Sequence, residues 1–167
     1  MELELISFNY RSSLLYEALR IYCTVWGRDK EESLSFFRKY ARMPDFLGYV
    51  ASYENSIVGM GFGTASQTGQ WWHDKVAEKV GTNHPALKDA WVLTELAVLR
   101  EYRQKNIGSL IHERLVKEIR HPNMLLSTQT DNTGAKRFYE HRGWTYLHKG
   151  FAFQEGRPLY CIMHKDI

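Results

Sequence analysis

The chain has 167 residues, enough to bury a sizeable core, and we expect residues 1–167 to form a single domain. Hydrophobic residues make up 44% of the sequence and charged residues 25%, which is ordinary for a globular protein. The formal net charge of +3 is too small for nucleic-acid binding by bulk electrostatics, so no nucleic-acid partner is expected.

The two cysteines and the N-terminal segment indicate the cellular environment. Cys23 and Cys161 lack the paired spacing of a disulfide framework or a thiolate metal site. Residues 1–8 contain two glutamates and no basic segment, unlike a signal peptide. No run reaches the roughly 18 apolar residues that a membrane-spanning helix needs. We therefore expect a cytoplasmic protein in a reducing environment, with no membrane partner.

The first half of the sequence predicts an antiparallel arrangement with two helices. The expected elements are a strand at 2–8, helices at 14–26 and from 30 onward, and a hairpin of strands at 47–53 and 57–65. Gly27 is expected to stop the first helix. Asp29 and Glu32 have the spacing of a capping box, which predicts that the second helix begins there.

The second half predicts alternating strands and helices after a poorly patterned segment at 66–90, which contains Trp71-Trp72-His73 and a short helix around 74–80. The remaining expected elements are strands at 91–99 and 124–128, helices at 107–120 and 133–142, and a closing hairpin of 144–153 and 159–164. A helix connects the strands at 91–99 and 124–128, so they should be parallel neighbours. Where such strands splay apart, unpaired backbone groups become available to bind a ligand like an added strand. The order indicates an α+β fold.

A first motif joins the strand at 94–98 to the helix that follows the turn Arg103-Gln104-Lys105-Asn106-Ile107-Gly108. A turn that opens into a helix gathers backbone N–H groups and the positive end of the helix dipole, which together favour a phosphate. Gly108 allows a close backbone approach, and Asn106 tolerates a positive φ. Taken alone, the segment is more typical of an ordinary strand-to-helix turn, because short turns with glycine are common.

A second motif covers residues 132–144. Ala135, Phe138 and Tyr139 share one helical face, and Gly143 is a suitable C-terminal stop. The helix is expected to be capped by Asp131 or Asn132. Periodicity alone favours Tyr139 as a core aromatic residue.

Together the two motifs resemble the GNAT superfamily of acyl-CoA-dependent N-acetyltransferases. Ala97-Val98 followed by the turn matches the family's strand and its Arg/Gln-x-x-Gly-x-Gly/Ala pattern, with Asn106 in place of the first glycine. Residues 132–144 match the family's Asn-x-x-Ala-x-x-Phe-Tyr-x-x-x-Gly-Phe/Trp pattern at every named position. The resemblance implies a single GNAT-like domain. Its mixed central sheet would have about six or seven strands, mostly antiparallel with a splayed parallel pair, and would be flanked by helices.

The resemblance also implies acetyl-CoA as cosubstrate and a set of residues that bind it. Backbone N–H groups at 104–109 would hold the pyrophosphate, Leu96 and Val98 would pair with the pantetheine arm, and Asn132 would contact the pantetheine region. The implied cofactor-binding residues are Leu96, Val98, Arg103, Gln104, Lys105, Asn106, Ile107, Gly108, Ser109 and Asn132. No histidine has metal-ligand spacing with another strong ligand, so no metal is expected.

The expected reaction is direct attack of an amine on the thioester through a tetrahedral intermediate. Glu95 is the candidate for the proton acceptor, although an exposed or ion-paired strand residue is an equal interpretation. Weaker alternatives for the base are His73, Asp74 and His84. The backbone N–H of Val98 is the expected oxyanion donor. In the family, the residue at Tyr139 protonates the departing thiolate, and an ordinary phenol with a pKa of about 10 carries the required proton at neutral pH.

The acceptor is less well defined than the cosubstrate. We expect its pocket to involve residues 26–29, the segment 66–90 and the final hairpin. Trp71 and Trp72 would either wall an amine pocket by cation–π contact or anchor that segment to the core. A small-molecule amine and a peptide amine are both open as acceptors, and a homodimer is possible by family analogy. The alternative function is a non-catalytic acyl-CoA-binding or regulatory domain, which would not require Tyr139.

Overall fold

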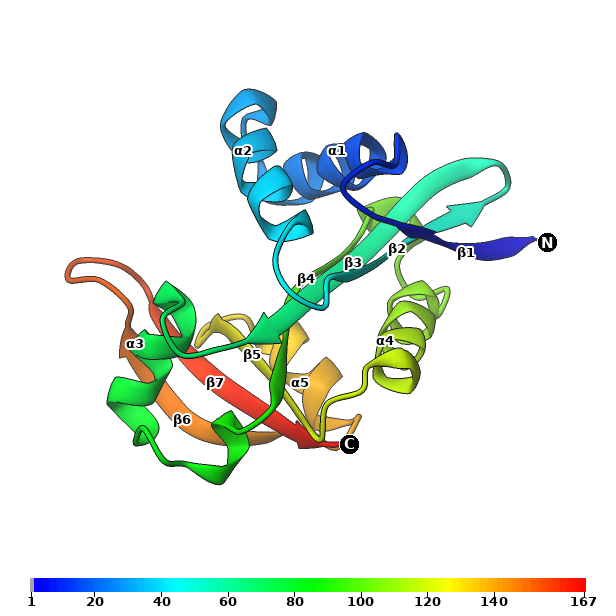
Figure 1. Ribbon diagram of the computed structural model, residues 1–167. Coiled ribbons are helices and arrows are strands. Elements are labelled where there is room, and N and C mark those ends of the chain that lie inside the picture. The colour runs from blue at the N-terminus through cyan, green and yellow to red at the C-terminus, as the bar shows by residue number, and fades with distance from the viewer. Residues whose placement is uncertain (1) are drawn as a thin grey trace. The chain divides into compact units, whose positions relative to one another are not determined.

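The computed structural model describes residues 2–167 and contains a seven-stranded mixed sheet in the order β1-β2-β3-β4-β5-β7-β6 (Figure 1). The strands are β1 (Leu3–Phe8), β2 (Leu47–Tyr53), β3 (Ser56–Ser66), β4 (Ala90–Val98), β5 (Asn123–Gln129), β6 (Thr145–Ala152) and β7 (Leu159–Asp166). The helices are α1 (Leu14–Trp26), α2 (Lys30–Ala41), α3 (Trp71–Val80), α4 (Ile107–Glu118) and α5 (Thr133–Glu140), with short 3-10 helices η1 (Pro85–Leu87) and η2 (Arg100–Tyr102). The expected α+β class is confirmed.

The chain forms two compact units. The first comprises the described residues up to Ala65 together with Leu93–Ile119, and the second comprises Ser66–Val92 and Arg120–Ile167. Strand β4 begins in the second unit and continues in the first.

Local sequence signals define the elements of the first unit. Gly27 has φ 64° and ends α1, with its N–H donating to the carbonyl of Cys23. The carboxylate of Asp29 accepts the N–H of Glu32 at 3.0 Å and so caps α2, as the sequence predicts. The turn between β2 and β3 places Glu54 and Asn55 at positive φ, the backbone form that suits a two-residue hairpin.

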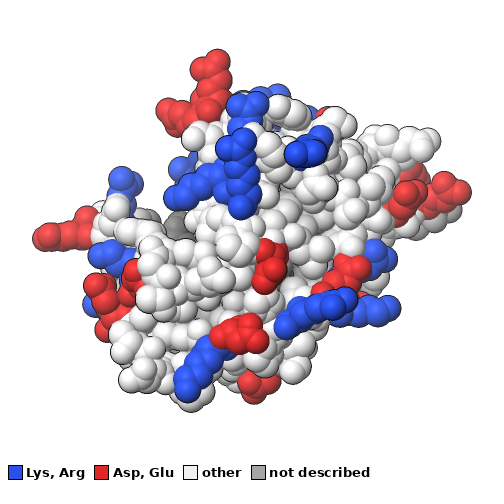
Figure 2. Space-filling view, in the orientation of Figure 1, with Lys and Arg blue, Asp and Glu red and all other residues white. Residues whose placement is uncertain are grey.

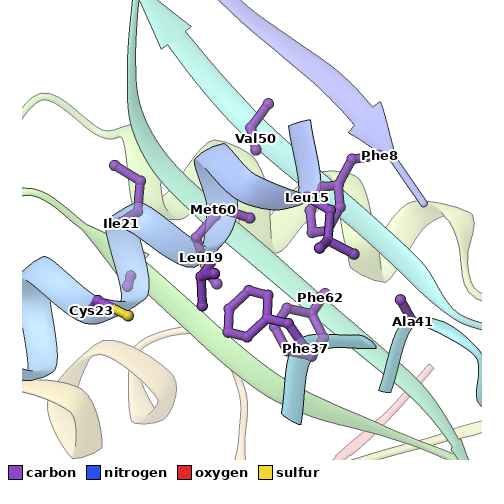
Figure 3. Close-up of a cluster of buried hydrophobic side chains, with 12 residues drawn as sticks. Phe8, Leu15, Leu19, Ile21, Cys23, Phe37, Ala41, Val50, Met60 and Phe62 are labelled. Carbon is purple, nitrogen blue, oxygen red and sulfur yellow. The ribbon is translucent and has the colours of Figure 1, made fainter. Parts of the chain in front are cut away.

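The core of the first unit lies between its strands and the helices α1 and α2. Figure 3 shows side chains of α1 and α2 meeting those of β2 and β3, with the rings of Phe37 and Phe62 5.2 Å apart between centroids. Ala97 of β4 belongs to the same cluster. Side chains alternate along a strand, so Glu95, two residues earlier, projects from the face of the sheet that α1 and α2 cover.

Helix α4 covers the other face of this part of the sheet (Figure 1). A Cβ atom added at Gly61 would lie 2.7 Å from Cγ2 of Ile111, and one at Gly59 would lie 3.4 Å from Cγ2 of Ile107. The two glycines of β3 therefore allow α4 to pack closely against the strand.

The second unit contains the parallel pair that the sequence predicts. Residues Ala90–Val92 of β4 pair in parallel with Asn123–Leu125 of β5. Strand β7 lies between β5 and β6 and is antiparallel to both. The second strand of the closing β6–β7 hairpin is therefore the one that pairs with β5, and β6 forms the edge of the sheet. One hydrophobic cluster of this unit contains Val76, Ala77, Ala86, Leu87, Ala90, Leu125, Phe151 and Ile162.

Helix α3 differs most from the expected element, because it begins at Trp71 and not near Asp74. Gln70 has an extended backbone and precedes the helix, while the carboxylate of Asp74 accepts the N–H of Gly69 at 3.0 Å. Asp74 therefore lies in the first turn of α3 and hydrogen-bonds to the loop that precedes the helix. Among residues 2–167, no helix has the length and apolar character that crossing a bilayer would require.

Candidate active site

The start of α4 has neither a side-chain cap nor an acidic residue in its first turn. Asn106 precedes the helix in the left-handed conformation, with φ 66° and ψ 14°, and its side chain makes no capping hydrogen bond. The first turn of α4 contains no acidic residue. At α2, by contrast, Asp29 caps the helix and the first turn contains Glu31 and Glu32. The positive end of α4 is therefore not neutralised by its own sequence and suits a phosphate group.

The turn before α4 bears exposed cations. The Nε of Arg103 donates to the carbonyl of Val98 at 3.1 Å, which ties the turn to the end of β4. The Nζ of Lys105 lies 5.6 Å from the ring centroid of Tyr53. Gln104, like Asn106, has a positive φ, which confirms that this turn uses left-handed backbone. The side chains of Ile107 and Ser109, in the first turn of α4, are buried.

The end of β4 directs part of its backbone away from β3. The N–H of Leu99 donates to the carbonyl of Val58 at 2.8 Å, so Leu99 faces β3. Peptide groups alternate in direction along an antiparallel strand, which turns the N–H groups of Leu96 and Val98 to the opposite side. The ladder with β5 ends at Val92. The expected pantetheine and oxyanion contacts at Leu96 and Val98 thus lie on the side of β4 that faces away from β3, past the residues of β4 that pair with β5.

Glu95 has a strongly perturbed carboxyl group in the first unit. Its side chain is half-buried, and burial raises its pKa to about 8. A side-chain hydrogen bond with Trp26 and the positive charge of Arg28 oppose this shift. Burial and, to a smaller extent, the charge of Glu95 raise the pKa of Tyr40. Glu95 therefore interacts electrostatically with groups of α1, of the turn after it and of α2.

The second motif lies entirely in the second unit. Oδ1 of Asn132 accepts the N–H of Ala135 at 3.1 Å, which confirms that Asn132 caps α5. Tyr139 is 9% exposed, and its ring makes edge contacts with Phe138 and Trp144 at centroid distances of 5.1 and 5.5 Å. Gly143 has φ 86° and follows the helix as the expected stop.

The three weaker candidates for the base each have a local structural partner. His73 is buried with Nδ1 2.9 Å from Oγ of Ser66, and burial lowers its pKa. Nδ1 of His84 accepts the N–H of Ala86 at 3.1 Å, and Asp74 caps its own loop as described above. These contacts favour structural roles for the three side chains.

The two tryptophans of α3 have different environments. Nε1 of Trp72 donates to Oγ of Ser127 at 3.1 Å, which anchors the segment to β5. Trp71 is 52% exposed and lies 5.6 Å from the ring centroid of Phe153. Trp71 is thus the more exposed of the two indoles.

Cysteines and metal ligands contribute no further site in the described chain. Cys23 and Cys161 are free thiols and are both buried. Among residues 2–167, no group of His, Cys, Asp and Glu has the geometry of a metal site.

Sequence reasoning missed three features near Glu95. It placed Trp26 in the acceptor region but did not predict its hydrogen bond with Glu95, and it did not predict the proximity of Tyr40. The hydroxyl of Thr64 is fully buried and has no hydrogen-bond partner among the described residues. Thr64 lies two residues after Phe62 in β3, so both side chains lie on the same face of the sheet as Glu95. No local pattern signals these contacts, because they join α1, α2, β3 and β4.

Positive charge gathers on the surface over α1 and α2 (Figure 2). The exposed basic residues of this region are Arg28, Lys30, Arg38, Lys39 and Arg42. Arg28 alone among them acts on the Glu95 carboxyl group.

Comparison with known proteins identifies the family. The model of the acetyltransferase (GNAT) family matches residues 13–144, so the chain belongs to that family and is an acetyltransferase by class. No curated protein sequence matches the chain.

Solved structures with the same fold include two acetyltransferases and a chain of the NatC complex. An acetyltransferase of the GNAT family from Streptococcus pneumoniae is 19% identical with a TM-score of 0.68, covering 99% of this chain and 100% of that one. The ribosomal-protein-S18-alanine N-acetyltransferase from Escherichia coli is 16% identical with a TM-score of 0.68, covering 99% and 94%. A chain of the NatC complex bound to Gag peptide and CoA is 14% identical with a TM-score of 0.69, covering 100% and 99%. At these identities the likeness establishes the fold.

Proposed function

We propose that this protein transfers an acetyl group from acetyl-CoA to a primary amine. The observation that carries the proposal is the start of α4, where a left-handed Asn106 leaves the helix without a side-chain cap and without acidic neighbours. Membership of the GNAT family supports acetyl-CoA as the cosubstrate. We propose that main-chain groups at 104–109 hold the pyrophosphate, with Arg103 and Lys105 adding positive charge, and that Asn132 contacts the pantetheine region.

We propose Glu95 as the proton acceptor. As the amine nitrogen forms its bond to the thioester carbon, Glu95 takes the proton of the amine, directly or through water. A carboxyl group with a pKa of about 8 is a stronger base than an ordinary glutamate and titrates near neutral pH. The N–H of Val98 stabilises the oxyanion of the tetrahedral intermediate.

Tyr139 is the proposed acid. When the carbon–sulfur bond of the intermediate breaks, the phenol of Tyr139 supplies a proton to the sulfur. Transfer is direct, so Cys23 and Cys161 need not become acylated. We predict that Tyr139→Phe slows turnover by about 10²–10⁴-fold, the usual contribution of general acid catalysis, while Kd for acetyl-CoA changes little. Stopped-flow turnover and calorimetric titration measure the two effects, and undiminished turnover would remove this role from Tyr139.

The proposed acceptor is a small-molecule or peptide amine. The similar structures include one named for the alanine of ribosomal protein S18 and one bound to a peptide, which supports a peptide amine. A cytoplasmic location and a homodimer are further proposals, supported by the free cysteines and by family analogy respectively.

Ligand-induced stabilisation tests the cosubstrate. At a concentration of 100 times Kd, acetyl-CoA should stabilise the native state by about 2.7 kcal/mol, which is a rise in Tm of roughly 5–11 °C for a chain of this size. Acetyl-CoA consumption is then screened against amines, amino acids, peptides and antibiotics. An unchanged Tm would refute the cosubstrate, whereas a raised Tm without acetylation of any amine would favour the non-catalytic acyl-CoA-binding domain.

A further inference from the structure

We propose that Tyr10, Tyr16, Arg38 and Arg42 form a docking surface for an acidic polypeptide segment in extended conformation. Tyr10 precedes α1, Tyr16 lies in the first turn of α1, and the two arginines lie at the C-terminal end of α2. All four residues belong to the first unit. Docking at this tyrosine–arginine surface is separate from the proposed acetyl transfer, because it uses none of the residues assigned to that reaction.

Each of the two arginines is held by a tyrosine. Nη2 of Arg38 donates to the hydroxyl of Tyr16 at 3.0 Å. The guanidinium of Arg42 lies over the ring of Tyr10, 4.0 Å from its centroid, and Nη2 donates to the hydroxyl of the same tyrosine. A phenol orients a guanidinium through its oxygen and its ring but, unlike a carboxylate, does not neutralise the positive charge.

The charges of these two arginines are not compensated within the described chain. Arg20, on α1, pairs with the carboxylate of Glu17 at 3.0 Å, whereas among residues 2–167 no carboxylate forms an ion pair with Arg38 or Arg42. Arg38 and Arg42 are also four residues apart, the spacing at which like charges on a helix repel each other. An anionic partner bound to both guanidiniums would relieve this repulsion.

Helix stability and packing explain only part of the arrangement. The negative end of the dipole of α2 favours cations in its last turn, which accounts for the charges but not for the tyrosines. Tyr10 is 36% and Tyr16 49% exposed, and both arginines are exposed, so these groups are accessible to a partner. The contact between α1 and α2 relies instead on buried side chains such as Leu15 and Phe37.

The spacing of the arginines favours carboxylates along an extended chain. Four residues of an α-helix span about 6 Å, and side chains two residues apart on an extended chain face the same side at a repeat of about 6.6 Å. Acidic residues at alternate positions can therefore each meet one guanidinium, whose fork of donors matches a carboxylate.

A nucleic acid fits this surface less well than an acidic polypeptide. Nucleic-acid binding depends on many phosphate contacts, and two guanidiniums within one helical turn are a small footprint for it. Glu31 and Glu32, in the first turn of the same helix, would repel a phosphate backbone that continued along α2.

Fluorescence anisotropy at 0.1 M salt tests the docking surface. The probe is a fluorescein-labelled peptide of four Glu-Ser repeats, and its control is the isomer with four consecutive glutamates followed by four serines, which has the same charge. We expect the alternating peptide to bind more tightly than the isomer. Arg38→Gln and Arg42→Gln should each raise its Kd about fivefold, the factor that corresponds to a well-formed surface ion pair.

Three further variants separate orientation from net charge. Lys30→Gln removes the same charge from an exposed position of α2 about 12 Å from Arg38, beyond the Debye length of about 10 Å, and should leave Kd unchanged. Tyr16→Phe removes the hydroxyl that orients Arg38 and should raise Kd about twofold at constant charge. The double variant of Arg38→Lys and Arg42→Lys keeps both charges but not the forked donors, and it should bind about fivefold more weakly than the wild type.

Four results would overturn the proposal. The first is no binding of the alternating peptide to the wild type. The second is equal affinity for the two peptides or an equal loss in Lys30→Gln, since attraction would then depend on net charge alone. The third is tighter binding of an oligothymidylate of equal charge, which would indicate a nucleic-acid surface. The fourth is a lower urea midpoint in Arg38→Gln and Arg42→Gln with unchanged peptide affinity, which would show that the tyrosine contacts only hold α2 against α1.

Discussion

The raised pKa of Glu95 predicts that this residue lowers the stability of the protein at alkaline pH. Below pH 4.5 the carboxyl group is protonated in both the native and the unfolded chain, and it makes no difference between them. Between pH 4.5 and about 8 the unfolded chain releases the proton while the native protein keeps it. Stability that is present at low pH is therefore lost by about 1.4 kcal/mol per pH unit, and the loss is complete above the native pKa.

The substitution Glu95→Gln removes this titration and retains the size of the side chain. A shift from 4.5 to about 8 corresponds to an upper limit of about 5 kcal/mol, and the half-buried position of Glu95 reduces the value actually reached. We expect Glu95→Gln to differ little from the wild type near pH 5, to become progressively more stable up to about pH 8, and to keep that difference at pH 9. The same variant should lose acetyltransferase activity, as is common where a functional group is held in an unfavourable environment.

Urea denaturation at pH 5, 7 and 9, followed by tryptophan fluorescence, measures the difference in the free energy of unfolding. Glu101→Gln is the matched control, because Glu101 is an exposed carboxylate of the same unit. A stability difference between Glu95→Gln and the wild type that is the same at all three pH values would refute the reasoning.

Three further substitutions test the packing and backbone around the site. Gly61→Ala places a Cβ 2.7 Å from Cγ2 of Ile111 and should lower the free energy of unfolding by about 1–3 kcal/mol. Gly59→Ala, whose nearest contacts would be 3.3 Å away, should lower it by less. Equal urea midpoints for the two variants would contradict this reasoning. Thr64→Val should raise stability by about 1 kcal/mol in the same assay, because it removes a buried hydroxyl without a partner, and a loss would show that the hydroxyl is satisfied. Asn106→Val should lower the free energy of unfolding by about 1–2 kcal/mol, because valine is strained in the left-handed backbone of this position, and it should weaken acetyl-CoA binding measured by calorimetry. Asn106→Gly should preserve binding. Similar Kd values for the two variants would show that the conformation of the turn does not determine acetyl-CoA binding.

Local chemistry made much of the first unit predictable. Gly27 and Asp29 mark the end of α1 and the start of α2 because each satisfies backbone groups within a few residues. Asn106 was predictable in the same way, since few other residues adopt its left-handed backbone. The start of α3, in the second unit, was not, because Gln70 precedes the helix without a side-chain capping bond and so leaves no local signal.

The sequence by itself determined the caps of α2 and α5 and the motifs of the GNAT family, because these depend on residues close together in the chain. It also determined the parallel pairing of β4 with β5, because a helix connects the two strands. Only the tertiary structure decided the chemical state of Glu95. Its pKa depends on burial and on Trp26 and Arg28, which come from the end of α1 and the turn after it, far away in the sequence. Electrostatic interactions act through space, so the strength of this base follows from packing and not from the residues beside it in the chain.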